Sequence, residues 1–447
     1  MNAILRLLTL RRNEVPRLLN AALVFFLVAV NDGIVKSVAA GVFNIRVGVE
    51  YLPNMYAWIA VLFAINMAGL SWLSAKVARQ QLLFGLMGVV ALLLLLNTTA
   101  LWLEHSRGVE PVVGFFPFLF ISSELCRSLC AFQVWIVAGG ICYTSRAKVL
   151  FPLLAASAYL GDITGGFATG LLGRLLASYQ LYGLTFLNMI VVIAALRPLV
   201  RRYFVSQETA EGEGASLPEN FRFFLRSADL RLLFALSVAV FAVYTAIHYA
   251  FNVVARENYL TEGEITGFLG MFYGTAGFAT LLVTAFALRV LLRWLGTGSV
   301  YLWVSVFYAA VAVVLLALFG DLLPMGGVAV VFALNLVSFL LLDSIVAPAY
   351  QVLIKLIPAR NSDGTRMIME GGFMLLGGLV GAGFTMLHAR EVLSLEQLFG
   401  LLTIVCALMV IVGWRYKRAY TQVLIRAVRE QDIDVEDDQA MESLVKV

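Results

Sequence analysis

Residues 25–43 read FFLVAVNDGIVKSVAAGVF, an apolar stretch with Asp32 and Lys36 near its middle. As a helix, the stretch is long enough to cross about 30 Å of hydrocarbon. A charge inside hydrocarbon costs about 3 kcal/mol or more, so it persists only when it is paired or faces a watery cavity. The sequence therefore predicts a membrane span that lines a path for something polar, which points to transport.

The composition excludes a soluble globular protein, because 61% of the residues are hydrophobic and only 13% are charged. The net charge of +4 gives no nucleic-acid signal, since the basic residues lie in short connections between apolar runs. The first twenty residues are amphipathic and lack a small-residue cleavage site, so we expect no cleavable signal peptide.

The hydropathy pattern predicts twelve membrane-spanning helices. The connections after even-numbered spans are richer in Lys and Arg than those after odd-numbered spans, and such basic connections stay in the cytoplasm. We therefore expect a multi-pass protein of the cytoplasmic (inner) membrane with both termini in the cytoplasm. The predicted spans lie near residues 20–44, 53–75, 81–103, 112–143, 149–177, 180–200, 231–255, 266–292, 298–320, 325–354, 366–388 and 394–415.

The longest polar connection, residues 206–231, follows the sixth span and divides the chain into two six-span halves. This layout predicts an all-α polytopic protein of the major-facilitator type, which has two six-helix halves with inverted repeats inside each. We expect a cytoplasmic amphipathic segment (1–19), an N-terminal bundle (20–203), a cytoplasmic linker (204–230), a C-terminal bundle (231–415) and a cytoplasmic tail (416–447).

The distribution of polar residues fits that fold. Its first, fourth, seventh and tenth helices line the central cavity, and its second, fifth, eighth and eleventh helices flank the cavity. In this chain the third, sixth, ninth and twelfth spans carry no ionisable residue in their interiors. The cavity-lining and flanking spans carry the candidate solute-binding residues Asp32, Lys36, Glu124, Arg127, Tyr244, His248, Asn252, Asp343 and Arg366, and the candidate coupling or gating residues Asp162 and Glu370.

Two charged pairs share a helix face. Asp32 and Lys36 are four residues apart, and Glu124 and Arg127 are three apart. Each pair is either a structural or gating ion pair, or a group that presents a cation to an anionic solute. Arg suits phosphate or carboxylate because its planar fork donates two bonds at once.

Asp162 lies among glycines that permit close helix contact, and it is either a proton or cation site or an inter-helix bond. Tyr244, His248 and Asn252 are spaced four residues apart, so they share one face of the seventh span. This polar stripe either lines the cavity, where it could form hydrogen bonds with a base or sugar, or contacts another helix.

Asp343 precedes Pro348, where a proline kink would free backbone carbonyls. Arg366 and Glu370 lie where the eleventh span leaves the cytoplasm. Arg366 either binds the solute or extends its side chain to the membrane–water interface.

Nothing in the sequence suggests an enzyme, a cofactor or a metal site. The three histidines lie in separate segments, and no nucleophile and base stand together. The four cysteines are expected to be small buried hydrophobic residues: Cys126, Cys130, Cys142 and Cys406.

Four segments give the chain a resemblance to a known family: residues 12–26, 31–37, 122–166 and 357–383. In their order and spacing they resemble the non-mitochondrial ATP/ADP carrier family of intracellular bacteria and plastids, with its relatives in free-living bacteria. The resemblance covers most of residues 11–415. It implies that Lys36, Glu124 and Arg366 match charged positions implicated in nucleotide exchange. The chain departs from the family in the seventh span, which has no carboxylate before Glu257.

The sequence thus predicts a secondary active transporter that moves an anionic, nucleotide-like solute by alternating access and exchange. Two alternatives stay open. One is a proton-coupled carrier of another metabolite with Asp32, Glu124 or Asp162 as the proton site. The other is a membrane sensor or scaffold with locked charge pairs. The expected partners are a nucleotide or phosphorylated metabolite and membrane lipid, with no nucleic acid. The tail is a solvated segment, or it recruits a cytoplasmic partner or leads into a missing domain.

Overall fold

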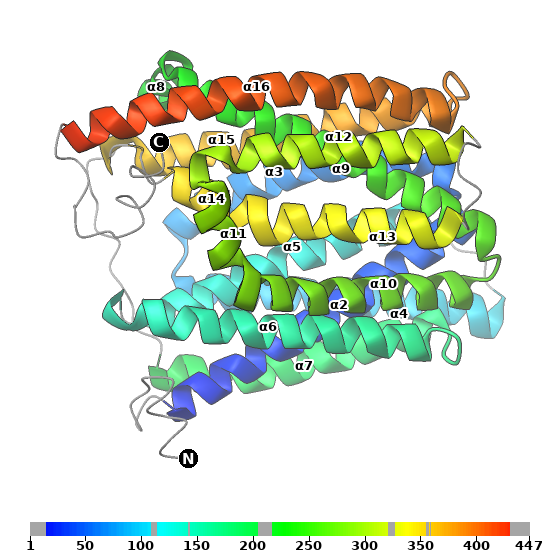
Figure 1. The fold of residues 1–447 in the computed structure, drawn as a ribbon. Coiled ribbons are helices and arrows are strands. Elements are labelled where there is room, and N and C mark those ends of the chain that lie inside the picture. The colour runs from blue at the N-terminus through cyan, green and yellow to red at the C-terminus, as the bar shows by residue number, and fades with distance from the viewer. Residues whose placement is uncertain are drawn as a thin grey trace. The chain divides into compact units, whose positions relative to one another are not determined.

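The computed structural model describes residues 15–108, 114–141, 144–203, 217–320, 327–354, 357 and 359–429. Every regular element within these residues is helical, and twelve helices are long and apolar enough to span a membrane (Figure 1). The predicted all-α, twelve-span fold is confirmed. The predicted terminal segments and linker fall partly on residues 1–14, 204–216 and 430–447, which lie outside the described residues. The division at 20–203 and 231–415 stays a prediction.

The chain forms two compact units. The first consists of Met1–Val49, Ile65–Ala210 and Ala255–Leu281. Its helices are α2 (Val15–Arg46), the second half of α3 (Leu52–Lys76), α4 (Arg79–Arg107), α5 (Phe115–Ile141), α6 (Thr144–Leu172), α7 (Ser178–Tyr203) and α10 (Glu262–Leu282).

The second unit consists of Glu50–Ala64, Glu211–Val254 and Leu282–Val447. It contains the first half of α3, α8 (Leu217–Arg226), most of α9 (Ala228–Asn258), a π-helical turn η2 (Val283–Ala287), α11 (Leu288–Leu295), the short turn η3 (Thr297–Ser299), α12 (Val300–Phe319), α13 (Gly327–Leu340), a π-helical turn η4 (Leu341–Val346), α14 (Ala347–Leu353), α15 (Ala359–Ala389) and α16 (Leu395–Arg429).

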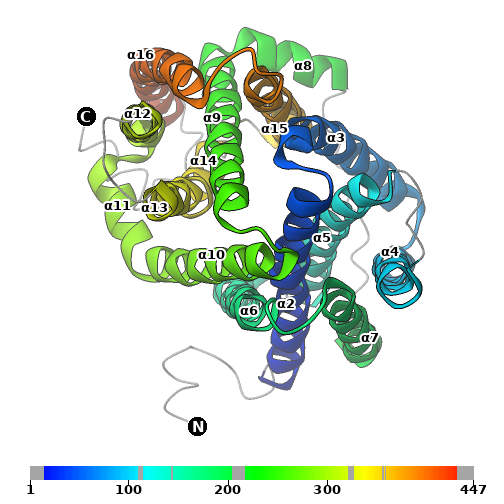
Figure 2. The same ribbon diagram turned by 90° about the vertical axis from the view of Figure 1, so that its right-hand side faces the viewer.

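Helix α2 is central to the first unit, where it packs against α5, α6 and α7 (Figure 2). Glycines set the distance between α2 and α6. A side chain at Gly161 or Gly165 would collide with the backbone carbonyls of Phe26 and Val30. Small residues of this kind let the backbones of membrane helices approach closely. The close crossing brings Asp162, which follows Gly161 on α6, next to the middle of α2.

The tenth span of the chain, which lies in the second unit, is not a single regular α-helix. The π-helical turn η4 contains Asp343 and is followed directly by α14, whose first turn holds Pro348. Proline lacks a backbone donor and crowds the preceding turn, so the wider turn lies where the sequence predicted a proline kink. Such π-turns frequently occur at functional sites.

Candidate functional site

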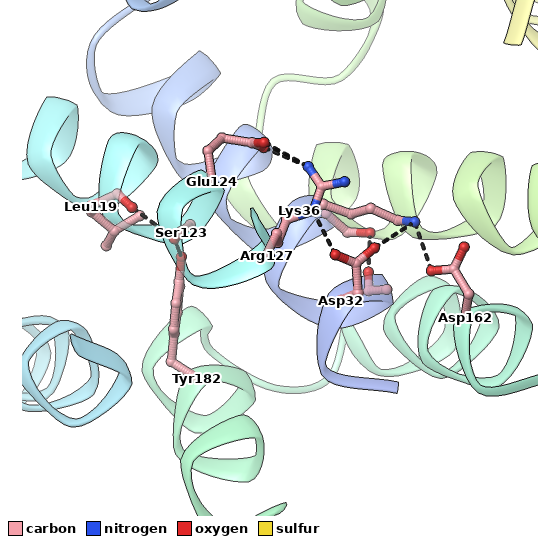
Figure 3. Close-up of polar contacts among 10 residues, drawn as sticks. Asp32, Lys36, Leu119, Ser123, Glu124, Arg127, Asp162 and Tyr182 are labelled. Carbon is pink, nitrogen blue, oxygen red and sulfur yellow. Dashed lines mark hydrogen bonds and ion pairs between the residues drawn. The ribbon is translucent and has the colours of Figure 1, made fainter. Parts of the chain in front are cut away.

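Lys36 is the most buried charged residue of the first unit's polar interior, with its side chain only 6% exposed. Its Nζ donates to Oδ1 of Asp162 at 2.7 Å and to Oδ2 of Asp32 at 3.2 Å (Figure 3). An ammonium group at this depth is stable only when carboxylates compensate for its lost hydration. Two carboxylates from two helices, α2 and α6, provide that compensation.

Arg127 extends the cluster from α5. Its Nε donates to Oδ1 of Asp32 at 2.7 Å, and its Nη1 donates to both oxygens of Glu124 at 2.7 and 2.8 Å (Figure 3). Asp32 therefore bridges two cations, one through each carboxylate oxygen. We call the linked residues the ion-pair chain; in order they are Glu124, Arg127, Asp32, Lys36 and Asp162.

The ion-pair chain carries unequal numbers of opposite charges. Three carboxylates face two cations, which gives a net charge of −1 when every group is ionised. Other members of the ion-pair chain are less buried than Lys36: the side chains of Asp162, Glu124 and Arg127 are 21%, 27% and 30% exposed. Neither cation is left without a carboxylate partner.

An aromatic ring from α10 completes the surroundings of Lys36. The Nζ atom lies 4.8 Å from the ring centroid of Tyr273, within the range of a cation–π contact. Sequence reasoning missed Tyr273, because an uncharged aromatic residue in an apolar span has no distinguishing pattern.

Helix α5 is held in place beside Glu124. The hydroxyl of the fully buried Ser123 lies 2.6 Å from the hydroxyl of Tyr182 on α7 and donates to the carbonyl of Leu119 at 2.7 Å (Figure 3). This contact fixes the rotation of α5 and so the direction in which Glu124 and Arg127 project.

A small cavity of about 20 Å³ borders the ion-pair chain between α2, α4 and α5. Asn31, Asp32, Arg127, Cys126 and Cys130 are among the residues that line it, and its wall is almost entirely apolar. These two cysteines and Cys406 are free and buried, as expected from the sequence. Cys142 lies outside the described residues.

The polar stripe of α9 lies in the second unit. The rings of Tyr244 and His248 stack with centroids 5.9 Å apart. The amide of Asn252 donates to the carbonyl of His248 at 2.9 Å within the same helix. Asn335 of α13, which sequence reasoning missed, places its Nδ2 3.3 Å from Nδ1 of His248.

Arg366 and Glu370 form the predicted pair near the start of α15, with Arg366 Nε 2.9 Å from Glu370 Oε1. Gln351 of α14 closes a ring with them, because it accepts from Arg366 at 2.7 Å and donates to Glu370 at 3.3 Å. Both charged side chains are partly exposed, at 46% and 36%. Asp343 lies in the π-helical turn that precedes α14.

A second group of ion pairs lies at the end of α2 and was not predicted. Arg46 contacts Glu104 at 3.2 Å and Glu262 at 2.9 Å. Ser178, the first residue of α7, also donates to Glu262. The contacts join the last residue of α2 to the first residue of α10. Among the described residues, no group of three or more His, Cys, Asp or Glu side chains is placed to hold a metal ion.

The chain is similar in structure to several solved transporters. A mutant of the nucleoside transporter NupG has a TM-score of 0.67 at 12% identity, with 90% of this chain and 99% of that chain covered. A bacterial homologue of the iron transporter ferroportin, in an inward-facing state, has a TM-score of 0.66 at 15% identity, with 90% and 99% covered.

A mutant of the peptide transporter POT in complex with sulfate has a TM-score of 0.64 at 12% identity, with 89% and 95% covered. These likenesses confirm the predicted major-facilitator-type fold. No protein-family model and no curated protein sequence matches the chain.

Proposed function

We propose that the chain is a secondary active transporter that moves a small anionic solute by alternating access, and that a proton enters the ion-pair chain when the anion binds. The observation that carries the proposal is the excess of carboxylates over cations around Lys36 and Arg127. A site that binds an anion without a proton would instead be expected to have at least one cation that lacks a close carboxylate partner.

The proton and the anion are linked through shared partners. An anion gains a strong bond to Lys36 only if Asp32 or Asp162 withdraws, and a carboxylate withdraws when it is protonated. If an anion of single charge bound without a proton, the net charge of the cluster would fall from −1 to −2. With a proton the net charge stays at −1. By linkage, the proton then strengthens anion binding as much as the anion strengthens proton binding.

The solute class rests on the sequence. The resemblance to nucleotide carriers favours a nucleotide-like anion, and the Tyr244–His248 stack in the second unit offers a flat surface of the kind that a base uses. The sequence also predicted exchange, whereas the ion-pair chain favours proton coupling. We therefore place the proton-coupled reading first and keep exchange as the second candidate.

Transport into liposomes distinguishes these readings. The purified chain is reconstituted, and labelled nucleotides and phosphorylated metabolites are supplied outside, with or without an inward proton gradient. Proton coupling predicts uptake that rises with the gradient. Uptake that depends only on preloaded internal solute would support exchange. No uptake of any solute under either condition would favour the sensor or scaffold.

A further inference from the structure

The short helix α8 is seated on the second unit by one face. The amide of Asn361 on α15 donates to Oδ1 of Asn220 at 2.9 Å, and Asn220 is only 2% exposed. One turn later, the buried ring of Phe224 contacts Phe234 of α9 with centroids 5.4 Å apart. A side chain at Gly364 would collide with the amide of Asn220. The position of α8 is therefore fixed.

The opposite face of α8 exposes large apolar side chains beside cations. Phe221 and Leu225 are one helical turn apart and 50% and 48% exposed. Arg222 comes directly after Phe221, Arg226 comes directly after Leu225, and both arginines are exposed. The helix thus presents an apolar stripe with an arginine stripe along its edge, while its buried face is already occupied by α9 and α15.

The depth of α8 relative to the membrane follows from the helices next to it. The eleventh span begins at Gly364, where α8 is docked, and the seventh span begins at Ala228, two residues after α8 ends. By length and composition, both points are the start of a candidate membrane span. The two views show α8 lying across the direction of α9 and α15 (Figures 1 and 2). A helix at this level and in this orientation lies along the membrane surface.

We propose that α8 is a lipid-binding surface helix, in which Phe221 and Leu225 insert at the boundary of the acyl chains and Arg222 and Arg226 bind the phosphates of anionic lipids. An amphipathic helix with apolar and basic stripes binds an interface through both the buried apolar area and the attraction of anionic lipids. Guanidinium groups donate two bonds at once to a phosphate. The proposal does not depend on the transported solute.

The lipid contact is coupled to α15 by the docking contact. Gly364 lies within two turns of Arg366 and Glu370 on the same helix, and Asn361 lies within about two and a half turns of both. A lipid that holds α8 therefore also holds the end of α15 that carries Arg366 and Glu370, which both bond Gln351 of α14.

The test uses the full chain in liposomes, with the native cysteines replaced and Leu225→Cys labelled by an environment-sensitive fluorophore. We expect blue-shifted emission and quenching by lipids brominated near the glycerol backbone. Both effects should be stronger with phosphatidylglycerol than with phosphatidylcholine alone. Emission typical of water, without quenching in either liposome, would overturn the proposal.

A charge-matched pair of variants tests the arginines. Arg222→Gln with Arg226→Gln should abolish the difference between the two lipids. Arg107→Gln with Arg390→Gln removes two exposed arginines elsewhere and should leave the difference unchanged. Equal loss in both double variants, or no loss in either, would contradict binding by α8. Thermal unfolding in detergent checks that each variant is folded.

Discussion

Lys36 and Asp162 are 126 residues apart in the chain, yet their charged atoms lie 2.7 Å apart. The contact joins the first span to the fifth and makes Asp162 the end of a series of alternating charges. Both readings of Asp162 from the sequence, a proton or cation site and an inter-helix bond, are compatible with this single contact. A protonated Asp162 would release Lys36 for another anion.

Asp162→Asn is expected to remove the dependence of uptake on a proton gradient, because the amide cannot take up the coupling proton. It also leaves the buried ammonium of Lys36 with one charged partner, so stability should fall by about 1–3 kcal/mol. Uptake at several external pH values and thermal unfolding measure the two effects. Asp162→Glu is the control and should retain gradient dependence. Unchanged gradient dependence in Asp162→Asn would place the proton elsewhere.

Lys36→Ala is expected to abolish uptake while the protein stays folded, since the remaining carboxylates, at 28% and 21% exposed, can be hydrated or protonated. Asp343→Ala in the second unit should do the same, because an alternating-access carrier binds its solute from both halves. Uptake by reconstituted variants and gel filtration measure the outcomes. Normal transport by either variant would remove that residue from the site, and loss of folding would favour a structural role.

Gly166→Ala is expected to destabilise the protein by about 1–3 kcal/mol because of overpacking, since the added Cβ would collide with the backbone of Gly274. Gly85→Ala provides the control, because a Cβ there meets nothing within 4 Å. In a helix that replacement is favourable by about 1 kcal/mol. Thermal unfolding in detergent should therefore move in opposite directions for the two variants. A similar shift for both would argue against tight packing of α6 on α10.

Glu262→Gln is expected to loosen the end of α2 from the start of α10, because it weakens the contact with Arg46 and removes the charge that Ser178 also faces. Thr266→Cys, at a side chain packed against Gly41, reports the separation through its reaction with a maleimide. Labelling should be faster in Glu262→Gln. The neighbouring Glu264→Gln removes the same charge from an exposed position and should not change the rate. Equal rates in all three backgrounds would show that Glu262 does not hold the end of α2 against the start of α10.

The orientation in the membrane is still a prediction from the basic connections. A single cysteine at Ala210, which lies outside the described residues, should react with an impermeant maleimide only after the membrane is opened. Arg390→Cys, in a predicted external connection, should react in intact cells. The reverse pattern would invert the predicted topology.

Hydropathy was sufficient to predict the twelve spans, because each span must be continuously apolar to cross hydrocarbon. Helical spacing was also sufficient for the pairs Asp32–Lys36 and Glu124–Arg127. The Arg127–Asp32 contact was not predictable, since it joins residues 95 positions apart and depends on how α2 and α5 pack. Sequence distance carries no information about such a contact.

Uncharged partners were harder to predict than charged ones. Tyr273, Asn335 and Gln351 all contact candidate residues, but each belongs to a residue type that also occurs in ordinary helix packing. Charge inside an apolar span is rare enough to signal a site. A tyrosine or an amide is not, so only the fold reveals which of them lie beside a charge.

The shared carboxylate of Asp32 has a consequence for communication between helices. Because acid and base alternate along the series, neutralising Glu124 at one end leaves Arg127 with Asp32 alone. Asp32 is then drawn toward Arg127, and Lys36 is drawn toward Asp162 at the other end. A protonation event on α5 is thus expected to reach α6 as a succession of partner changes. No proton has to travel between the helices, and the signal crosses α2 through two side chains on a single helical turn.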